Sequence, residues 1–281
     1  MLGPMNEHQL VEKIIEWLEE DMPFGDITSQ NITFSDHKVK ATFIAKENGI
    51  ICGMDVMKLV FHTLDNSIVF KPSVKDGDFI QSGLTLGTLS GPLDKILMGE
   101  RLALNLCQRL SGISTMSHLY AQAVKHFPIR IVDTRKTTPG LRLLEKYAVR
   151  VGGCYNHRYG LSDAVMIKDN HIAAAGSMQN AVTQIRSRIP HTTKIEVEVE
   201  NLDALKEALD LDVDIIMLDN MTNDMLLAAV AINQGRALLE ASGNMTIDRI
   251  VDVAKTGVNI ISVGALTHSV QALDISLKFL S

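Results

Sequence analysis

A dense group of cations follows the apolar run 129–132, which is typical of a buried strand. Arg135 and Lys136 come directly after it, and Thr137 is expected to cap a helix that Pro139 helps to open. Residues 133–171 contain seven Lys or Arg against four Asp or Glu, whereas the whole chain has a net charge of −6. Cations gathered in this way on an acidic protein favour a site for a small, multiply charged anion.

Polar residues also follow five later candidate strands. The six expected strand ends are residues 133–136, 168–171, 196–200, 219–220, 240–244 and 264–267. In parallel α/β barrels the carboxyl ends of the strands carry the active site, so these six segments are expected to meet at one edge. His157 and Arg158 add further cationic groups between the first two segments.

Carboxylates dominate the third and fourth strand ends. Glu196, Glu198 and Glu200 alternate along one run, so they share one face of their strand. Glu200 can also be explained as a residue that simply ends the strand in solvent. A buried Glu198, in contrast, needs a cation or a metal nearby. Glu198 and Asp219 are the candidate ligands for Mg²⁺ through water, or for ribose hydroxyls.

The last two strand ends are rich in small residues. Ser242 and Gly243 lead towards a helix capped by Thr246, and Gly264 and Ala265 lead into another short helix. Backbone N–H groups at helix starts bind phosphate, and barrels often place phosphate after their final strands. Ordinary turn chemistry also explains glycine here, but two such loops together favour the phosphate site.

Two regions with different periodicity are expected to position these residues. Residues 1–112 predict an α+β sandwich domain, opened by a helix over 7–20 and followed by short strands. A long helix over 93–125 is expected to break near Ser111 and Gly112. Residues 113–269 then alternate strand and helix with six apolar strands, which indicates an incomplete α/β barrel with a parallel sheet. A C-terminal helix over 270–281 is expected to pack on the first domain.

Composition excludes several classes of protein. A sequence pI of about 5.8 and 5% aromatic residues argue against a nucleic-acid-binding module. No apolar run is long enough to span a bilayer, and residues 1–10 lack a signal-peptide pattern. Three widely spaced cysteines fit a reducing compartment, so a cytoplasmic location is expected.

An ordered set of motifs resembles the quinolinate phosphoribosyltransferase family over nearly the whole length. They include Glu-Arg-Leu-Ala-Leu-Asn at 100–105, Asp-Thr-Arg-Lys-Thr-Thr-Pro-Gly at 133–140 and Asn-His-Arg-Tyr-Gly-Leu at 156–161. Lys-Asp-Asn-His at 168–171, Glu-Val-Glu-Val-Glu at 196–200, Leu-Asp-Asn at 218–220 and Glu-Ala-Ser-Gly at 240–243 continue the set. Asn244 departs from it, because a glycine is common there in the family.

The resemblance implies an enzyme, a nicotinate-nucleotide diphosphorylase (carboxylating) of NAD synthesis, and a role for each matching residue. Quinolinate and phosphoribosyl pyrophosphate would give nicotinate mononucleotide, pyrophosphate and CO₂ with Mg²⁺ as cofactor. The implied substrate-binding residues are Arg101, Thr134, Arg135, Lys136, His157, Arg158, Lys168, Glu198, Asp219, Ser242, Gly243, Gly264 and Ala265. The implied catalytic residues are Lys136, Lys168, Glu198 and Asp219, the last two also facing the metal. The family pattern further implies a homodimer in which the neighbouring subunit supplies Arg101, with higher assembly left open.

Two other enzyme readings stay open at this point. A relative with the same fold could transfer phosphoribose to another acceptor. A Schiff-base lyase or aldolase could use Lys136 or Lys168 as its nucleophile.

Overall fold

The computed structural model describes residues 6–32 and 38–280, so the sequence-based expectations for 1–5, 33–37 and 281 lie outside it. The chain divides into two compact units. Unit 1 comprises Met1–His118, Leu143–Gly153 and Val270–Ser281, and unit 2 comprises Leu119–Arg142 and Cys154–Ser269. The chain therefore leaves each unit and returns to it, which a simple division into residues 1–112 and 113–269 does not capture.

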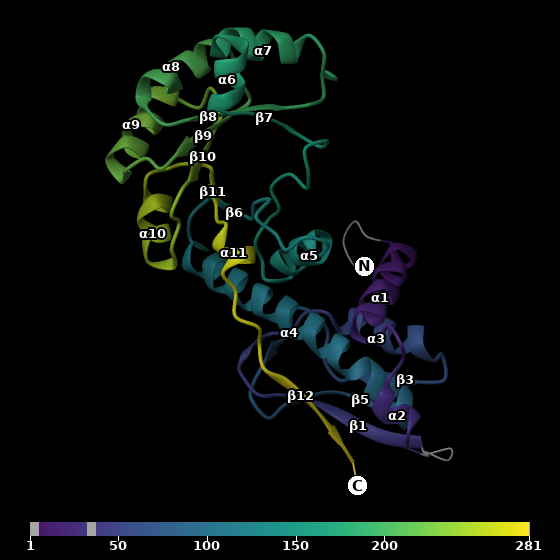
Figure 1. Ribbon diagram of the computed structural model, residues 1–281. Helices are drawn as coiled ribbons and strands as arrows, with labels where there is room; N and C mark the ends of the chain where they lie inside the picture. The colour runs from purple at the N-terminus through teal and green to yellow at the C-terminus, as the bar shows by residue number, and fades with distance from the viewer. Residues whose placement is uncertain (1–5, 33–37, 281) are drawn as a thin grey trace. The chain divides into compact units, whose positions relative to one another are not determined.

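Unit 1 is built on an antiparallel sheet. Four strands lie in the order β12 (Ile275–Phe279), β1 (Lys38–Ala45), β5 (Thr85–Pro92) and β3 (Val69–Pro72). The short strands β2 (Gly49–Ile50) and β4 (Phe79–Ile80) pair separately. Helices α1 (Glu7–Asp21), α2 (Ile27–Gln30), α3 (Met54–Leu64) and α4 (Leu93–Ala123) complete the α+β layer arrangement (Figure 1).

The core of unit 1 is aromatic and aliphatic. The Phe43 ring contacts the Phe61 and Phe70 rings at centroid distances of 6.1 and 5.8 Å, so the sheet and α3 share one apolar layer. Leu10, Ile14 and Leu18 recur at the helical spacing of α1 and are buried, as the sequence period predicts.

Two expectations for unit 1 are wrong. Residues 275–279 form the strand β12 rather than a helix, and β12 pairs antiparallel with β1. Helix α4 runs without a break through Ser111 and Gly112. A Cβ at Gly112 would collide with the backbone oxygen of Gln271, so this glycine permits close approach of the C-terminal segment instead of ending the helix.

Helix α5 (Arg142–Val151) places most of its length in unit 1. Glu145 is fully buried, and its carboxylate lies 2.6 Å from the Arg109 guanidinium of α4. Ser114 Oγ donates to the backbone oxygen of Ala148 at 2.8 Å, which fixes α5 along α4. These contacts explain why a segment from the middle of the sequence packs with the first domain.

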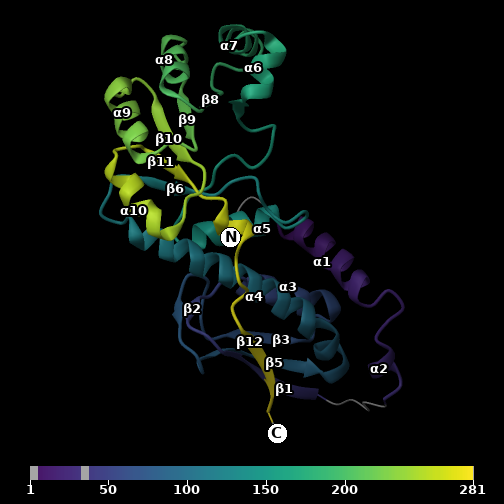
Figure 2. The ribbon, with the colours of Figure 1, turned by 60° about the vertical axis from the view of Figure 1, so that its left-hand side comes forward.

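Unit 2 contains the expected six parallel strands. Their order is β6 (Arg130–Val132), β11 (Ile260–Ser262), β10 (Leu238–Ser242), β9 (Ile215–Asp219), β8 (Ile195–Val199) and β7 (Val165–Ile167). No hydrogen-bonded pairing joins β6 to β7 among the described residues, so the sheet is an incomplete barrel. The six carboxyl ends consequently lie at the same edge (Figure 2).

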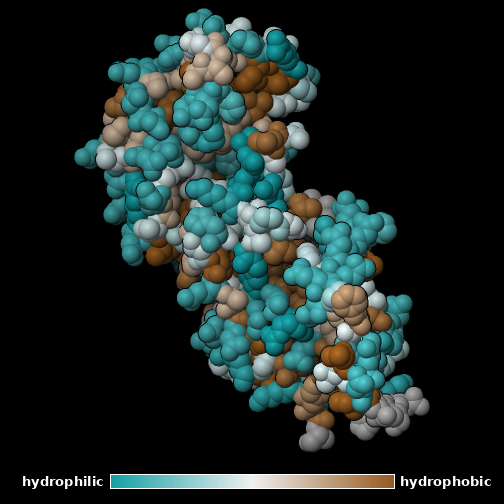
Figure 3. Space-filling model, viewed as in Figure 1, coloured by the Kyte–Doolittle hydropathy of each residue, from teal (hydrophilic) through white to brown (hydrophobic). Residues whose placement is uncertain are grey.

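Helices cover the outside of this sheet (Figures 1 and 2). They are α6 (Asp169–Ala175), α7 (Met178–Arg186), α8 (Leu202–Asp210), α9 (Asn223–Asn233), α10 (Ile247–Lys255) and the short α11 (Ala265–His268). Helices α6 and α7 are separate, because Gly176 adopts φ +86° and Ser177 caps a new start. Figure 3 shows a mixed surface over this unit, with hydrophobic patches among hydrophilic residues. Within the described residues, no helix is long and apolar enough to cross a membrane.

Candidate active site

Asp133, at the end of β6, organises the first part of the site. This carboxylate is fully buried and accepts hydrogen bonds from Asn156 Nδ2 at 2.7 Å and from the His157 backbone N–H at 2.8 Å. The Asp133 N–H also donates to the backbone oxygen of Tyr155 at 3.1 Å. A buried carboxylate is costly unless it is well hydrogen-bonded, so the segment 155–157 is fixed beside β6.

The loop after Asp133 is not the helix start that Thr137 and Pro139 predicted. Helix α5 begins only at Arg142. Thr137 Oγ1 accepts from Arg142 Nε at 2.9 Å, and Arg142 Nη1 donates to the backbone oxygen of Tyr159 at 3.1 Å. Thr137 therefore does not cap a helix. Its hydrogen bond with Arg142 holds the loop in place instead.

Two expected cations lie on this tied loop. Arg135 and Lys136 are exposed, and Thr134 is half-buried with its hydroxyl accepting the Lys136 N–H at 3.1 Å. Arg158 is half-buried and donates to the backbone oxygen of Ala164 at 3.2 Å. Burial, and then the positive charge of Arg135, lower the pKa of Arg158. Two guanidinium groups that repel each other favour an anion between them.

A further expected cation, Lys168, is paired within the protein. Its ammonium forms an ion pair with the Glu198 carboxylate, which comes from the neighbouring strand β8. The backbone N–H of Lys168 donates to His171 Nδ1 at 3.0 Å, so His171 helps to fix the start of α6. Charge on adjacent strand ends is therefore balanced locally, as the alternation of acidic and basic segments indicated.

The three glutamates of β8 lie in very different surroundings. Glu196 is buried, Glu198 is half-buried and Glu200 is exposed. Glu200 thus ends in solvent, as one of its two interpretations held. Glu196 and Glu198 are less exposed, so their carboxylates need cationic partners.

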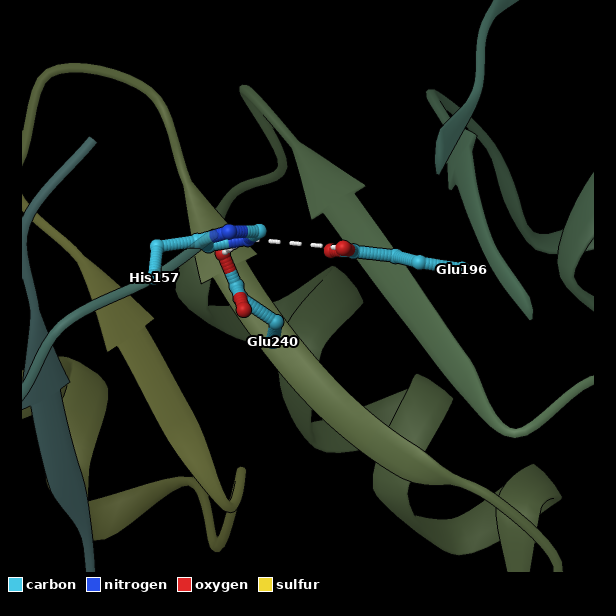
Figure 4. A group of neighbouring side chains, drawn as sticks. All are labelled: His157, Glu196 and Glu240. Atoms are coloured by element: carbon cyan, nitrogen blue, oxygen red, sulfur yellow. Dashed lines mark ion pairs between the residues drawn. The ribbon is translucent and has the colours of Figure 1, made fainter. Parts of the chain in front are cut away.

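Figure 4 shows that the His157 ring meets two carboxylates, Glu196 from β8 and Glu240 from β10. His157 Nε2 lies 3.4 Å from Glu196 Oε2 and 3.4 Å from Glu240 Oε1. Burial alone would lower the pKa of His157, but the hydrogen bonds and charges of the two glutamates outweigh it and raise that pKa to about 10. Burial raises the pKa of Glu196, and Glu240 adds to this against the opposing effect of His157.

Asp219 and the loop after β10 form the other side of the strand-end edge. Asn220 Nδ2 donates to Asp219 Oδ2 at 2.6 Å, and the Asn220 N–H donates to the backbone oxygen of Ser242 at 3.0 Å. Gly243 has φ +90°, a conformation that disfavours any side chain. Arg249 donates to the backbone oxygens of Gly243 and Met221, at 3.0 and 2.7 Å, and so joins the loops after β9 and β10.

The loop after β11 lies beside Lys136. A Cβ on Gly264 would be 3.3 Å from Lys136 Cδ, and Thr267 Oγ1 donates to the Lys136 backbone oxygen at 2.8 Å. Gly264 precedes the four-residue helix α11, which begins at Ala265. Thr246 occupies the N-cap position of α10 but its side chain makes no capping bond. The two glycine loops and one lysine thus lie together, with backbone N–H groups available for an anion.

Arg101 is the one expected site residue in unit 1. It is exposed on α4, and no ion pair found among residues 6–32 and 38–280 includes it. The other twelve expected substrate-binding residues belong to unit 2.

Sequence reasoning gave no role to Glu196, Glu240, Asn220 or Arg249. Glu240 begins the segment that was interpreted as a phosphate loop, and Glu196 shares a face with Glu198. Period-2 alternation put Glu196 on the strand face that carries Glu198, but it did not concern Glu240, and the contact of both glutamates with one histidine depends on strand order, which was not predicted. Nothing in the sequence singled out Arg249 as a functional residue, because an arginine in a helix ordinarily faces solvent.

Comparisons with known proteins identify the family and the fold. The family model of the quinolinate phosphoribosyl transferase N-terminal domain matches residues 26–111, and that of the C-terminal domain matches residues 113–278. The crystal structure of NadC from Streptococcus pyogenes superposes with a TM-score of 0.93 at 42% identity, covering 99% of both chains. The nicotinate-nucleotide pyrophosphorylase structure from Francisella tularensis gives 0.94 at 39% identity, covering 100% of this chain and 99% of that one.

Curated relatives share the same description. The probable nicotinate-nucleotide pyrophosphorylase [carboxylating] of Synechocystis is 46% identical over 94% of this chain and 90% of its own length. The protein so described in Bacillus subtilis is 45% identical over 97% of this chain and 94% of its own length. With both domain models matched in order and the site geometry in place, the chain belongs to the quinolinate phosphoribosyltransferase family.

Proposed function

We propose that this chain transfers the phosphoribosyl group of phosphoribosyl pyrophosphate to quinolinate and releases pyrophosphate and CO₂, giving nicotinate mononucleotide for NAD synthesis. The observation that carries this proposal is one edge of a parallel sheet on which two opposed guanidinium groups, strand-end carboxylates and two glycine loops lie together. Membership of the family supplies the reaction class.

Arg135 and Arg158 are the proposed receptors for quinolinate. Quinolinate is a planar dianion, and the guanidinium fork matches a carboxylate in two parallel hydrogen bonds. The pKa of Arg158 is lowered by burial and by Arg135, so the two cations repel each other when no anion is bound. A bound dianion removes this repulsion, which favours quinolinate over acceptors with one carboxylate.

The phosphoribosyl donor is assigned to the opposite side of the edge. Ser242, Gly243, Gly264 and Ala265 offer backbone N–H groups for the 5′-phosphate, and Lys136 lies beside Gly264. Asp219, oriented by Asn220, faces the ribose. Catalysis then rests mostly on positioning and charge, because the ring nitrogen needs only to meet an electron-poor ribosyl carbon as pyrophosphate leaves.

The chain's own residues also favour the second step. After transfer the ring nitrogen is cationic, so the carbon beside it can hold the electron pair that the departing CO₂ leaves, and that carbon then takes up a proton from water to give nicotinate mononucleotide. Arg135, Arg158 and Lys168 hold the ring in place, and Glu198 keeps Lys168 directed through their ion pair. Lys136 and Lys168, together with Glu198 and Asp219, are the proposed catalytic residues.

Magnesium fits the donor set at Glu198 and Asp219. Both side chains are half-buried carboxylates at the ends of the paired strands β8 and β9, and carboxylate oxygens with room for water are the ligands that Mg²⁺ accepts. When bound, the ion would neutralise charge on the leaving pyrophosphate. The Glu198 carboxylate is already paired with Lys168. Contact with Mg²⁺ through water or substrate therefore suits this site better than coordination by protein ligands alone.

A homodimer is proposed because unit 1 exposes both large apolar residues and a cation. Phe24, between α1 and α2, and Ile27, the first residue of α2, are 95% and 77% exposed. Large apolar side chains this exposed are typical of interaction surfaces when they cluster. Arg101 is exposed on α4 of the same unit and would complete the partner's quinolinate site. All three cysteines are free and buried, which suits the cytoplasm.

Subunit complementation tests this assembly. Arg101→Ala and Lys168→Ala homodimers are expected to be nearly inactive. Refolded together in equal amounts, they should regain about a quarter of wild-type activity, because half the dimers are mixed and each has one intact site. No recovery from heterodimers verified by mass spectrometry would show that Arg101 serves its own subunit.

A Schiff-base lyase is the weaker alternative. The Lys168 ammonium is held by Glu198, and a paired ammonium lacks the free electron pair that attack on a carbonyl needs. Borohydride with substrate should therefore leave the mass of the protein unchanged.

The decisive experiment mixes protein, Mg²⁺, phosphoribosyl pyrophosphate and either quinolinate or nicotinate. Quinolinate should yield nicotinate mononucleotide and CO₂ in equal amounts, and kcat/KM for nicotinate should be lower by about 10⁴-fold, because one cationic subsite stays unpaired. Comparable use of nicotinate would identify a relative with another acceptor, and absence of turnover with both would refute the proposal.

A further inference from the structure

His157, Glu196 and Glu240 form a buried cluster that the proposed reaction does not itself explain. The side chains of Glu196 and Glu240 are 4% and 2% exposed, and that of His157 is 13% exposed. In Figure 4 the imidazole ring points its Nε2 edge at both carboxylates, which reach it from different strands. Glu196 Oε1 has no hydrogen-bond partner within the described residues, and Glu240 Oε1 has only the 3.4 Å contact with His157 Nε2. Two carboxylates thus depend on a single ring nitrogen.

The other edge of the ring is also used. His157 Nδ1 accepts the backbone N–H of Arg158 at 2.7 Å. The His157 N–H donates to the buried Asp133 carboxylate at 2.8 Å. The segment 157–158 is therefore fixed by carboxylates on two sides, Asp133 from the end of β6 and the glutamate pair from β8 and β10. Arg158 is the residue whose main chain this arrangement holds.

Electrostatics gives the cluster a retained proton. Two ionised carboxylates this deeply buried repel each other, and a neutral imidazole offers them only one N–H. The groups that face the cluster are Asp133 from β6, and Arg158, whose charge acts on Glu196. The hydrogen bonds and charges of the two glutamates raise the pKa of His157. Because Nδ1 is an acceptor, the proton lies on the carboxylate side of the ring, and its titration belongs to the cluster as a whole.

We propose that Glu196 and Glu240 are positioning residues for the quinolinate site: they hold His157, and His157 holds the main chain of Arg158, so that the guanidinium is directed at the substrate. This role rests on the proposed function. A network that locks the rotamer of a binding residue is the usual means of holding a site in its productive geometry.

A divalent cation is the competing occupant. Within the described residues, His157, Glu196 and Glu240 are the one group of three possible ligands whose donor atoms lie within 4.8 Å of one another. Coordination by Nε2 requires a lone pair there, however, and the hydrogen bond from Arg158 to Nδ1 places the ring proton on Nε2. The geometry therefore favours a proton over a metal.

The kinetic test uses Glu240→Gln, which keeps the shape and removes the charge. KM for quinolinate should rise about 10- to 100-fold, with KM for phosphoribosyl pyrophosphate within about twofold of wild type. Glu200→Gln, at the exposed end of the same edge, is the matched control and should leave both constants unchanged. The alkaline limb of kcat/KM for quinolinate should move to lower pH in Glu240→Gln, and Glu240→Asp should restore part of the loss. Equal rises in both KM values would indicate general disturbance and overturn the role.

A spectroscopic test uses the unmodified protein, so it requires neither enzyme turnover nor a correctly folded variant. Nitrogen-15 labelled histidine should show His157 with a protonated Nε2 and an acceptor Nδ1, unchanged from pH 6 to 9. The opposite tautomer, or strong broadening of that signal by Mn²⁺ alone, would overturn the proposal in favour of a metal site. If wild type turned over neither acceptor while His157 showed the expected tautomer, the proposed function would fail and the cluster geometry would stand.

Discussion

The proposed acceptor and donor ends of the site are held by different physical means. At the acceptor end, which comprises Arg135, His157, Arg158, Glu196 and Glu240, buried charges fix the side chains. At the donor end, around Asn220, Gly243, Asn244 and Gly264, backbone conformation does so: φ is +54° at Asn220, +90° at Gly243 and +50° at Asn244. The acceptor end should therefore respond to charge and pH, and the donor end to shape.

The difference fits what each end is proposed to recognise. A planar dianion is distinguished by the number and direction of its charges, which side chains provide. A phosphate ester is held by several N–H groups at once, which a strained loop can present together. A substitution that changes charge at the donor end, or backbone shape at the acceptor end, should therefore have little effect. This expectation can be tested with single variants.

The largest effect is expected from Gly243→Ala. An added Cβ would collide with Asn220 Oδ1 and lie 2.9 Å from the Asn220 backbone nitrogen, at a φ of +90°. kcat/KM for phosphoribosyl pyrophosphate should fall about 100-fold or more. Gly235→Ala is the control, because Gly235 has φ +78° but nothing within 4 Å of an added Cβ. It should cost about 1 kcal/mol of stability and spare activity; similar kinetics for the two variants would remove the steric argument.

Arg158→Lys tests the acceptor end by changing the shape of a charge without removing it. Lysine cannot form the paired hydrogen bonds of a guanidinium. The binding of quinolinate should therefore weaken by about 2–3 kcal/mol, which appears as a higher KM for quinolinate. The affinity for phosphoribosyl pyrophosphate, measured by calorimetry without quinolinate, should not change. The exposed Arg188→Lys serves as the matched conservative change. An unaltered KM for quinolinate would remove Arg158 from the acceptor site.

pH should reach stability through the acceptor end. An unfolded histidine loses its extra proton near pH 6.5, whereas Glu196 and Glu240 raise the pKa of His157 to about 10 in the folded cluster. Because Nδ1 accepts a hydrogen bond, the retained proton belongs to Nε2 and the two carboxylates together, and the folded cluster holds one more proton than the unfolded chain in this window. The free energy of unfolding should therefore fall as pH rises from about 6.5 to 10. The slope is at most about 1.4 kcal/mol per pH unit. Urea denaturation of His157→Gln should show a flatter profile, and the exposed His126→Gln should follow wild type.

Asn244→Gly should have the smallest effect. Glycine adopts φ +50° without strain, which stabilises the loop, but it loses the hydrogen bond from Asn244 Nδ2 to Asn220 Oδ1 at 3.5 Å. These opposite contributions should leave KM for phosphoribosyl pyrophosphate within about twofold of wild type. A tenfold increase would give Asn244 a direct role at the donor end.

The sequence was most informative where local pattern and final environment agree. Six apolar runs with polar ends predicted the parallel sheet and its edge, because burial on both faces leaves few alternatives. Glycine was harder to interpret: Gly112 indicated a helix break but instead makes room for Gln271. Likewise, the capping signals at Thr137 and Pro139 were overridden when Thr137 bound Arg142.

Contacts between strands were beyond sequence reasoning. Glu196 and Glu240 are far apart in sequence, and only the order β8, β9, β10 brings them to one histidine. The C-terminal strand was missed for a similar reason. Residues 275–279 form a strand because they pair with β1, and that partner lies at the other end of the chain.

That late strand has a consequence for how the protein is made. Until residues 275–279 leave the ribosome, β1 presents an unpaired edge, although its other neighbour, β5, has long been available. Completion of the first unit must therefore wait for nearly the whole chain, and such non-local pairing is slow. Nascent chains should expose this edge to chaperones or to one another throughout synthesis of the barrel.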